Sequence, residues 1–157
     1  MKLSLTFSGQ SGLKGDPSAC GYSSAKHALA GMVGCLSQEM AMFGLKCLLL
    51  EPGYFRTKAL KQGNLRHEPG FIPAYEQFNQ GVLQFETAVW GNEPGDPVKG
   101  VARMIDVITS TGTADGKAFP LHVPIGSDGI KTLRDRAQAD LKLCYEWGSV
   151  MKTTDIA

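Results

Sequence analysis

The chain has 157 residues, 43% of them hydrophobic and 20% charged, which is enough for one domain with a core and ordinary for a globular protein. The formal net charge is +1, so no global field attracts nucleic acid or an anionic membrane. We therefore expect a small organic substrate or a protein partner, with no nucleic acid and no membrane.

The cysteines and histidines indicate the redox compartment of the protein and whether it binds a metal. The four cysteines form no Cys-x-x-Cys pair and the three histidines are isolated, which predicts free thiols and no metal site. Residues 1–8 are too few and too polar for a signal peptide. No apolar run approaches the roughly 20 residues that span a bilayer. The expected location is cytoplasmic.

The first third of the chain changes its hydrophobic period from two to that of a helix. Leu3, Leu5 and Phe7 alternate with polar residues, which predicts a strand, and glycines then predict a loop. Residues 23–43 carry apolar side chains at three- and four-residue steps, which predicts a helix. These side chains are Leu29, Val33, Leu36, Met40 and Phe43. The apolar run 47–50 predicts a strand that is buried on both faces.

The rest of the chain alternates helices with one more strand. A long connection, 54–94, keeps a helical spacing at Ile72, Tyr75, Phe78, Val82, Phe85 and Val89. Asp96 and Pro97 begin a helix as N-cap and first residue. Its expected apolar face is Val98, Val101, Ala102, Ile105 and Ile108. Alternation over 119–123 predicts a third strand, and Ser127 is expected to cap a last helix with apolar residues Ile130, Leu133, Ala137, Leu141, Cys144 and Tyr145.

Alternating strands and helices define the fold class. The order predicts an α/β fold, a truncated Rossmann-like three-layer arrangement of about three parallel strands with helices on both faces, in a single domain 1–157. The outer edge of the first strand must be paired or covered. Gly31 and Gly34 would allow another helix to approach the first helix closely. We therefore expect a homo-oligomer, or a complementing chain, that binds through the first strand and first helix.

Tyr22 and Lys26 are the first candidates for chemistry. Side chains four residues apart lie on the same side of a helix. An ammonium beside a phenol favours the phenolate, so the pair suits acid–base catalysis. Taken alone, Tyr-x-x-x-Lys occurs often by chance, and a surface tyrosine beside a surface lysine is the alternative interpretation.

Longer segments resemble the short-chain dehydrogenase/reductase family in order and spacing. They are Ser8-Gly-Gln-Ser-Gly-Leu-Lys-Gly15, Tyr22-Ser-Ser-Ala-Lys26, Glu51-Pro-Gly-Tyr-Phe-Arg-Thr57, Asp96-Pro97 and Pro124-Ile-Gly-Ser-Asp128. The resemblance covers essentially the whole chain and looks closest to fungal members. It implies the C-terminal half of such a protein, with the dinucleotide-binding half absent.

The resemblance also implies roles for individual residues. Tyr22 would be the general acid/base, and Lys26 would hold the nicotinamide ribose and favour the ionised tyrosine. Pro52, Gly53 and Thr57 would line the nicotinamide, if one is bound. The connection 54–94 would be the substrate lid, and its aromatic side chains could line an apolar pocket or simply pack in the core.

Two departures from the family pattern limit these roles. The family's catalytic serine lies thirteen residues before the tyrosine, where this chain has Gly9. Of the neighbouring serines, Ser11 in the loop is the more plausible stand-in, because Ser8 at a strand end would point to the opposite side from position 9. The glycines at 9, 12 and 15 do not have the Gly-x-Gly-x-x-Gly spacing of a phosphate-binding turn.

Three functions are compatible with these residues. The first is an enzyme that uses Tyr22 and Lys26 on a small apolar oxygenated substrate without nicotinamide, for isomerisation, dehydration or cyclisation, so that the chain alone needs no cofactor. The second is an NAD(P)-dependent oxidoreductase that another chain completes. The third is a non-catalytic remnant or binding protein. Nucleotide titration would discriminate between them.

Overall fold

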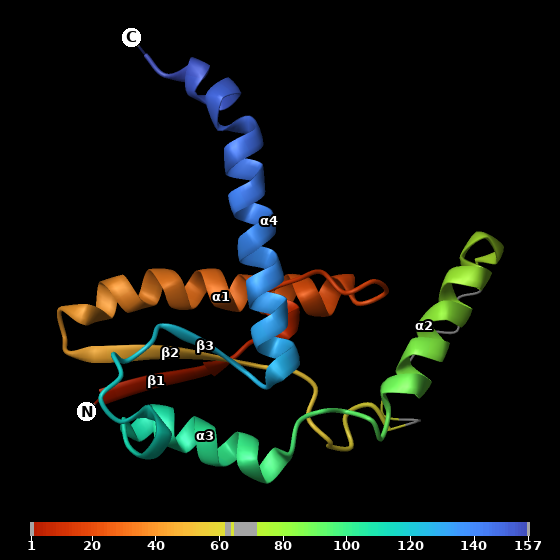
Figure 1. Cartoon of the computed structure of the whole chain (residues 1–157), viewed down its shortest axis with the longest axis horizontal. Helices are drawn as coiled ribbons and strands as arrows, with labels where there is room; N and C mark the ends of the chain where they lie inside the picture. Colours follow the sequence, from red (N-terminus) through yellow and green to blue (C-terminus); the bar gives the residue numbers. More distant parts are fainter. Residues whose placement is uncertain (1, 62–63, 65–71, 157) are drawn as a thin grey trace.

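The computed structural model describes residues 2–61, 64 and 72–156, and its centre is a parallel sheet. The strands are β1 (Lys2–Phe7), β2 (Leu45–Pro52) and β3 (His122–Ile125), in the order β1-β2-β3 (Figure 1). Thr6 pairs with Leu49, and Leu49 pairs with His122. The predicted α/β fold with three parallel strands is therefore confirmed.

The central strand β2 carries the core. Residues 47–51 of β2 are all buried. On one face, Cys47 and Leu49 pack against Val33 of helix α1 (Cys20–Ala41). On the other face, Leu48 and Leu50 pack with Ile125 and with side chains of helix α3 (Pro97–Thr109). Helices thus cover both faces of the sheet, as the continuous apolar run of β2 predicts.

Helix α3 begins as predicted but presents a different face to the sheet. The Asp96 carboxylate accepts hydrogen bonds from the backbone N–H groups of Val98 and Lys99, and Pro97 is the first helical residue. Of the expected apolar face, Val98, Val101 and Ile105 are exposed. The side chains that pack on the sheet are Met104, Val107 and Ile108. The orientation follows from Gly100, which is buried and leaves room for the Phe55 ring.

The ends of α1 and α4 differ in detail from the expectation. Helix α1 begins at Cys20, a turn earlier than predicted, so that Tyr22 and Lys26 are both helical. Helix α4 (Ser127–Met151) has Gly126 at its N-cap, with Ser127 as its first residue and no side-chain cap. The prediction that Ser127 caps this helix is therefore wrong by one residue.

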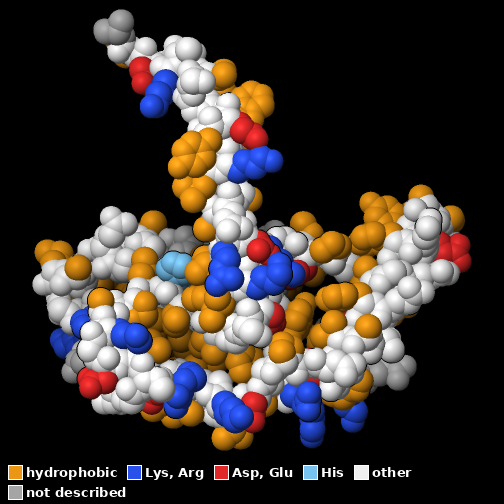
Figure 2. Space-filling view, viewed as in Figure 1, with side chains coloured by type: hydrophobic (Ala, Val, Ile, Leu, Met, Phe, Trp, Pro, Cys, Tyr) orange, Lys and Arg blue, Asp and Glu red, His pale blue; other side chains and the backbone are white. Residues whose placement is uncertain are grey.

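Two helices extend away from the sheet. Helix α2 (Glu76–Val89), which follows a short 3-10 helix (Pro73–Tyr75), has no buried residue. The outer half of α4 also projects from the body (Figure 1), and apolar side chains are visible along both helices (Figure 2). Within the described residues, no helix has the length and apolar character to cross a membrane. The expected lid aromatics Tyr75, Phe78 and Phe85 are exposed.

Candidate active site at the carboxyl ends of the strands

Tyr22 and Lys26 lie together where α1 starts, beside the carboxyl end of β1. The Lys26 Nζ donates a hydrogen bond of 3.0 Å to the carbonyl oxygen of Phe7, the last residue of β1. The same Nζ is 5.4 Å from the centroid of the Tyr22 ring. The Tyr22 side chain is largely open to solvent, at 57% exposure. The structure therefore brings this predicted pair together, with the phenol accessible to a substrate.

The loop that follows β1 approaches the end of β2 at Gly9. Gly9 has φ +70°, in the left-handed region that favours glycine. A Cβ atom at this position would lie 3.6 Å from the carbonyl oxygen of Pro52. A serine here would be strained by its backbone rather than by lack of space. Glycine at position 9 therefore fits the backbone conformation of this loop.

The neighbouring serines are engaged inside the loop. Ser11 is buried, and its hydroxyl donates a 2.6 Å hydrogen bond to the Asp16 carboxylate. Ser8 is fully buried, and its hydroxyl faces the Gly9 carbonyl at 3.4 Å. To donate a hydrogen bond to a substrate carbonyl, the Ser11 hydroxyl would have to give up its hydrogen bond to Asp16. The role of Ser11 stays a prediction.

The turn after β2 is held by β3 and α4. The Gly53 N–H donates to the Ile125 carbonyl at 2.8 Å, and the Tyr54 N–H donates to the Asp128 carboxylate at 2.6 Å. Pro52 and Gly53 therefore lie at the carboxyl edge of the sheet, beside the Gly9 loop. Thr57 lies in the exposed bend beyond, where its hydroxyl oxygen accepts from the Ala59 N–H at 3.2 Å.

Tyr54 is a second phenol in this region. Burial raises the pKa of Tyr54, and the negative charges of Asp16 and Asp128 raise it further. The phenol of Tyr54 is therefore protonated at neutral pH and can donate a hydrogen bond, but it is not a base. The sequence alone places Tyr54 only at the start of the lid, because its contact with Asp128, 74 residues away, leaves no local signal.

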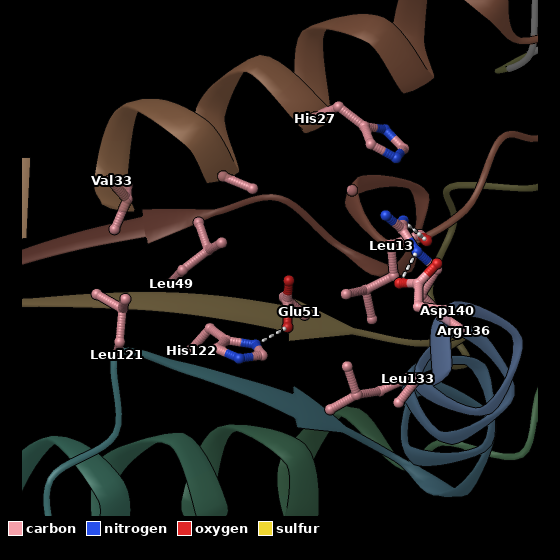
Figure 3. Close-up of a pocket in the computed structure, with 13 residues that line it drawn as sticks. Leu13, His27, Val33, Leu49, Glu51, Leu121, His122, Leu133, Arg136 and Asp140 are labelled. Carbon is pink, nitrogen blue, oxygen red and sulfur yellow. Dashed lines mark hydrogen bonds and ion pairs between the residues drawn. The ribbon is translucent and has the colours of Figure 1, made fainter. Parts of the chain in front are cut away.

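A separate hollow of about 390 Å³ lies between α1 and α4, over β2 and β3 (Figure 3). Its floor contains Glu51, which is 1% exposed and accepts a 2.9 Å hydrogen bond from Nδ1 of His122. This hydrogen bond raises the pKa of His122. Sequence reasoning treats the histidines as isolated and misses this pair, because it depends on the register between β2 and β3.

No cluster of three or more histidine, cysteine or carboxylate side chains suited to a metal ion occurs among the residues that the structure describes. The four cysteines are free thiols, as expected; Cys47 is buried and the other three are exposed.

Comparison with known proteins gives the same family that the motifs suggest. A family model described as "short chain dehydrogenase" matches residues 5–68. An uncharacterized oxidoreductase of Bacillus subtilis is 35% identical over 151 residues, which cover 94% of this chain and 50% of the relative. An oxidoreductase of Botryotinia fuckeliana is 46% identical over 117 residues, or 74% of this chain and 40% of the relative.

Two further matches extend the comparison. An NADPH-dependent 3-dehydrocapnine reductase of Ornithobacterium rhinotracheale is 28% identical over 102 residues, or 62% of this chain and 34% of the relative. The crystal structure of a short-chain dehydrogenase from Streptomyces avermitilis matches with a TM-score of 0.75 and 27% identity, over 98% of this chain and 53% of that one. The chain thus spans about half the length, or less, of the relatives that it matches.

The fold is an α/β fold that resembles part of the Rossmann fold of the short-chain dehydrogenases. The chain is similar to the short-chain dehydrogenases over residues 5–68, and to two oxidoreductases over 94% and 74% of its length.

One prediction about the extent of the resemblance is wrong. The residues that match the family model, 5–68, belong to the family's dinucleotide-binding region, so this region is not absent from the chain. The prediction inferred that this region is absent because the chain lacks the glycine spacing of a phosphate-binding turn. The helix with Tyr22 and Lys26 and the strands on either side of it belong to the same Rossmann sheet, whose carboxyl edge is where such folds bind nucleotides.

Proposed function

We propose that this chain acts in an NAD(P)-dependent oxidoreductase, with Tyr22 as general acid/base on a small oxygenated organic substrate. The observation that carries the proposal is the position of Lys26, whose Nζ lies both at the carboxyl end of β1 and 5.4 Å from the Tyr22 ring. The matched relatives are oxidoreductases, and the name of one includes NADPH dependence. These matches favour the nicotinamide-dependent alternative over chemistry without nicotinamide.

The residues at the strand ends suit the nicotinamide end of such a cofactor. Gly9 keeps a side chain away from the carboxyl end of β2, where a Cβ atom would lie 3.6 Å from the Pro52 carbonyl oxygen, and the Lys26 ammonium can donate to ribose hydroxyls. Pro52, Gly53 and Thr57 follow β2 and would contact the nicotinamide ring. A bound nicotinamide supplies or accepts a hydride.

The residues of this chain would then transfer the proton that accompanies the hydride. In reduction, Tyr22 donates its phenolic proton to the carbonyl oxygen; in oxidation, its phenolate accepts the alcohol proton. The Lys26 charge stabilises the phenolate that reduction leaves behind. Because Tyr22 is exposed, a lid would be needed to exclude water. Of the predicted lid 54–94, residues 62–63 and 65–71 lie outside the described residues, and the exposed Phe78 and Phe85 of α2 would be its substrate-facing side.

A partner chain would complete this site most simply at β1. Within the part of the chain that the structure describes, the order β1-β2-β3 leaves the outer edge of β1 without a neighbouring strand. A second copy or a complementing chain that pairs there would extend the sheet towards the cofactor. Cofactor affinity would then rise with protein concentration.

Calorimetric titration with NADPH and with NADH tests the proposal. We expect saturable binding of at least one nucleotide, and weaker binding by Lys26→Met. Lys131→Met is the matched control, since Lys131 is exposed on α4 and pairs with Asp135. If the folded chain binds neither nucleotide over a wide range of protein concentration, the proposal fails and a non-catalytic role is favoured.

A further inference from the structure

The first turn of α4 holds the turn that follows β2. The Asp128 Oδ2 accepts the Tyr54 N–H at 2.6 Å, although the two residues are 74 positions apart. A charged acceptor makes this stronger than a hydrogen bond between neutral groups. Asp128 lies in the first turn of the helix, where the positive end of the helix dipole stabilises its carboxylate.

The same carboxylate explains why position 53 is a glycine. A Cβ atom on Gly53 would collide with the Asp128 carboxylate, whose carbon and two oxygens are its three nearest neighbours. The backbone of Gly53 does not itself demand glycine, because its φ lies outside the left-handed region. A side chain at position 53 would therefore displace Asp128 from the Tyr54 N–H.

Close packing fixes the carboxylate in this position. A Cβ atom on Gly129 would lie 3.3 Å from the Glu51 carbonyl oxygen and 3.4 Å from the Gly53 nitrogen, so the helix approaches the end of β2 closely. The Asp128 Oδ1 is buried and has no hydrogen-bond partner among the described residues. A buried oxygen without a hydrogen bond raises the free energy of the folded state. The carboxylate is therefore held in place by close packing and by its single hydrogen bond from the Tyr54 N–H.

We propose that Asp128 is a positioning residue that sets the conformation of the Pro52–Gly53–Tyr54 turn and, through it, the cofactor side of the site. Pro52 transmits the effect, because its carbonyl oxygen lies 3.6 Å from the Cβ position of Gly9, in the loop beside the Lys26 anchor on Phe7. The part that concerns the cofactor rests on the proposed function; the part that concerns the turn does not.

Amide NMR of the whole chain tests the contact directly. In the unaltered chain we expect the Tyr54 amide to resonate at low field and to exchange slowly. Asp128→Ala should remove both features, while Asp128→Asn, which keeps an oxygen acceptor, should restore much of the protection. Asp135→Ala is the matched control, because Asp135 is exposed on the same helix and contacts Lys131. An unchanged Tyr54 amide in a folded Asp128→Ala chain overturns the proposal.

A double-mutant cycle tests the collision at Gly53. Gly53→Ala alone should move the Tyr54 amide resonance and lower the thermal midpoint. In the Asp128→Ala background the same substitution should have little further effect, because the colliding carboxylate is gone. Additive effects of the two substitutions would show that Gly53 is constrained by something other than Asp128, and would count against the proposal.

NADPH titration of the same variants separates the two proposals. We expect Asp128→Ala to weaken binding by roughly tenfold, the effect of losing a hydrogen bond to a charged group, and Asp135→Ala to leave it unchanged. If the unaltered chain binds no nucleotide, the proposed function fails, and so does the proposal that Asp128 positions the cofactor side. The amide data still test whether Asp128 sets the conformation of the turn. If binding is unchanged although the Tyr54 amide has moved, Asp128 does not position the cofactor side.

Discussion

Lys26 links the two parts of the candidate site at the scale of single residues. Its ammonium is fixed by the Phe7 carbonyl at 3.0 Å and faces the Tyr22 ring. This arrangement leaves the phenol free to meet a substrate, since Tyr22 is more than half exposed. Removal of the Tyr22 hydroxyl group should therefore lower the rate of proton transfer without affecting folding.

Substitution of Tyr22 by Phe separates chemistry from packing. Tyr22→Phe keeps the ring but removes the proton, and we expect turnover to fall by about two to four orders of magnitude, the usual contribution of a general acid/base. Circular dichroism should be unchanged. Tyr145→Phe is the control, since this tyrosine is 83% exposed on the outer half of α4. Full activity in a correctly folded Tyr22→Phe chain would show that Tyr22 does not transfer the proton.

His122 should make stability depend on pH. The hydrogen bond to Glu51 raises the His122 pKa above its usual 6.5, so the pair contributes stability fully below that value, and the contribution is lost as the pH rises through the raised pKa. We expect a higher urea midpoint at pH 6 than at pH 8. The difference in the free energy of unfolding between the two pH values stays below about 1 kcal/mol, because the His122 side chain is 44% exposed.

Another histidine in the same hollow provides the control for His122. His27 of α1 and Arg136 and Asp140 of α4 also line it. His122→Gln should remove most of the pH dependence, whereas His27→Gln should keep it. An undiminished dependence in His122→Gln would show that the stabilising proton resides elsewhere.

How far the site can be predicted from sequence depends on the separation of its parts. Tyr22 and Lys26 are one helical turn apart, so their proximity follows from spacing alone. The contacts of Asp128 with Tyr54 and of His122 with Glu51 join residues more than 70 positions apart. Such contacts depend on strand order and register, which hydrophobic periodicity does not specify.

At the scale of elements, α3 shows what periodicity leaves open. The helix carries two apolar stripes, one with Val98, Val101 and Ile105 and the other with Met104, Val107 and Ile108. Hydrophobic spacing predicts the helix correctly but does not choose between the stripes. Gly100 makes the choice, because only a residue without a side chain accommodates the Phe55 ring. The first stripe is consequently left exposed.

Gly100→Ala tests this account of α3. Alanine favours a helix over glycine by about 1 kcal/mol, but a Cβ here would collide with the Phe55 ring. We expect a net loss of about 1–3 kcal/mol in urea unfolding, as for other overpacked sites. In α4, a Cβ atom at Gly148 would meet no atom within 4 Å, so Gly148→Ala should instead stabilise slightly. Equal stability of the two variants would rule out Gly100 as the packing determinant.

At the scale of the whole molecule, many large apolar side chains are exposed. Helix α2 buries no residue, the outer half of α4 exposes Leu141, Tyr145 and Trp147, and the edge strand β1 exposes Leu5 and Phe7. Large apolar patches of this kind mark interaction surfaces. The outer edge of β1, which no strand of the described residues pairs, adds unpartnered backbone groups.

We therefore expect the chain to associate through β1 and α1. A Cβ atom added at Gly31 or Gly34 of α1 would meet no atom within 4 Å, so a second helix could approach there closely. Light scattering should give a mass above the 16.9 kDa of one chain, rising with concentration. Gly31→Glu would place a charge in the expected interface and should shift the equilibrium towards the monomer. Lys131→Glu, at an exposed position on the inner half of α4, should not. A compact monomer of the unaltered chain at every concentration would exclude this interface, because the exposed apolar surfaces would then be tolerated without a partner.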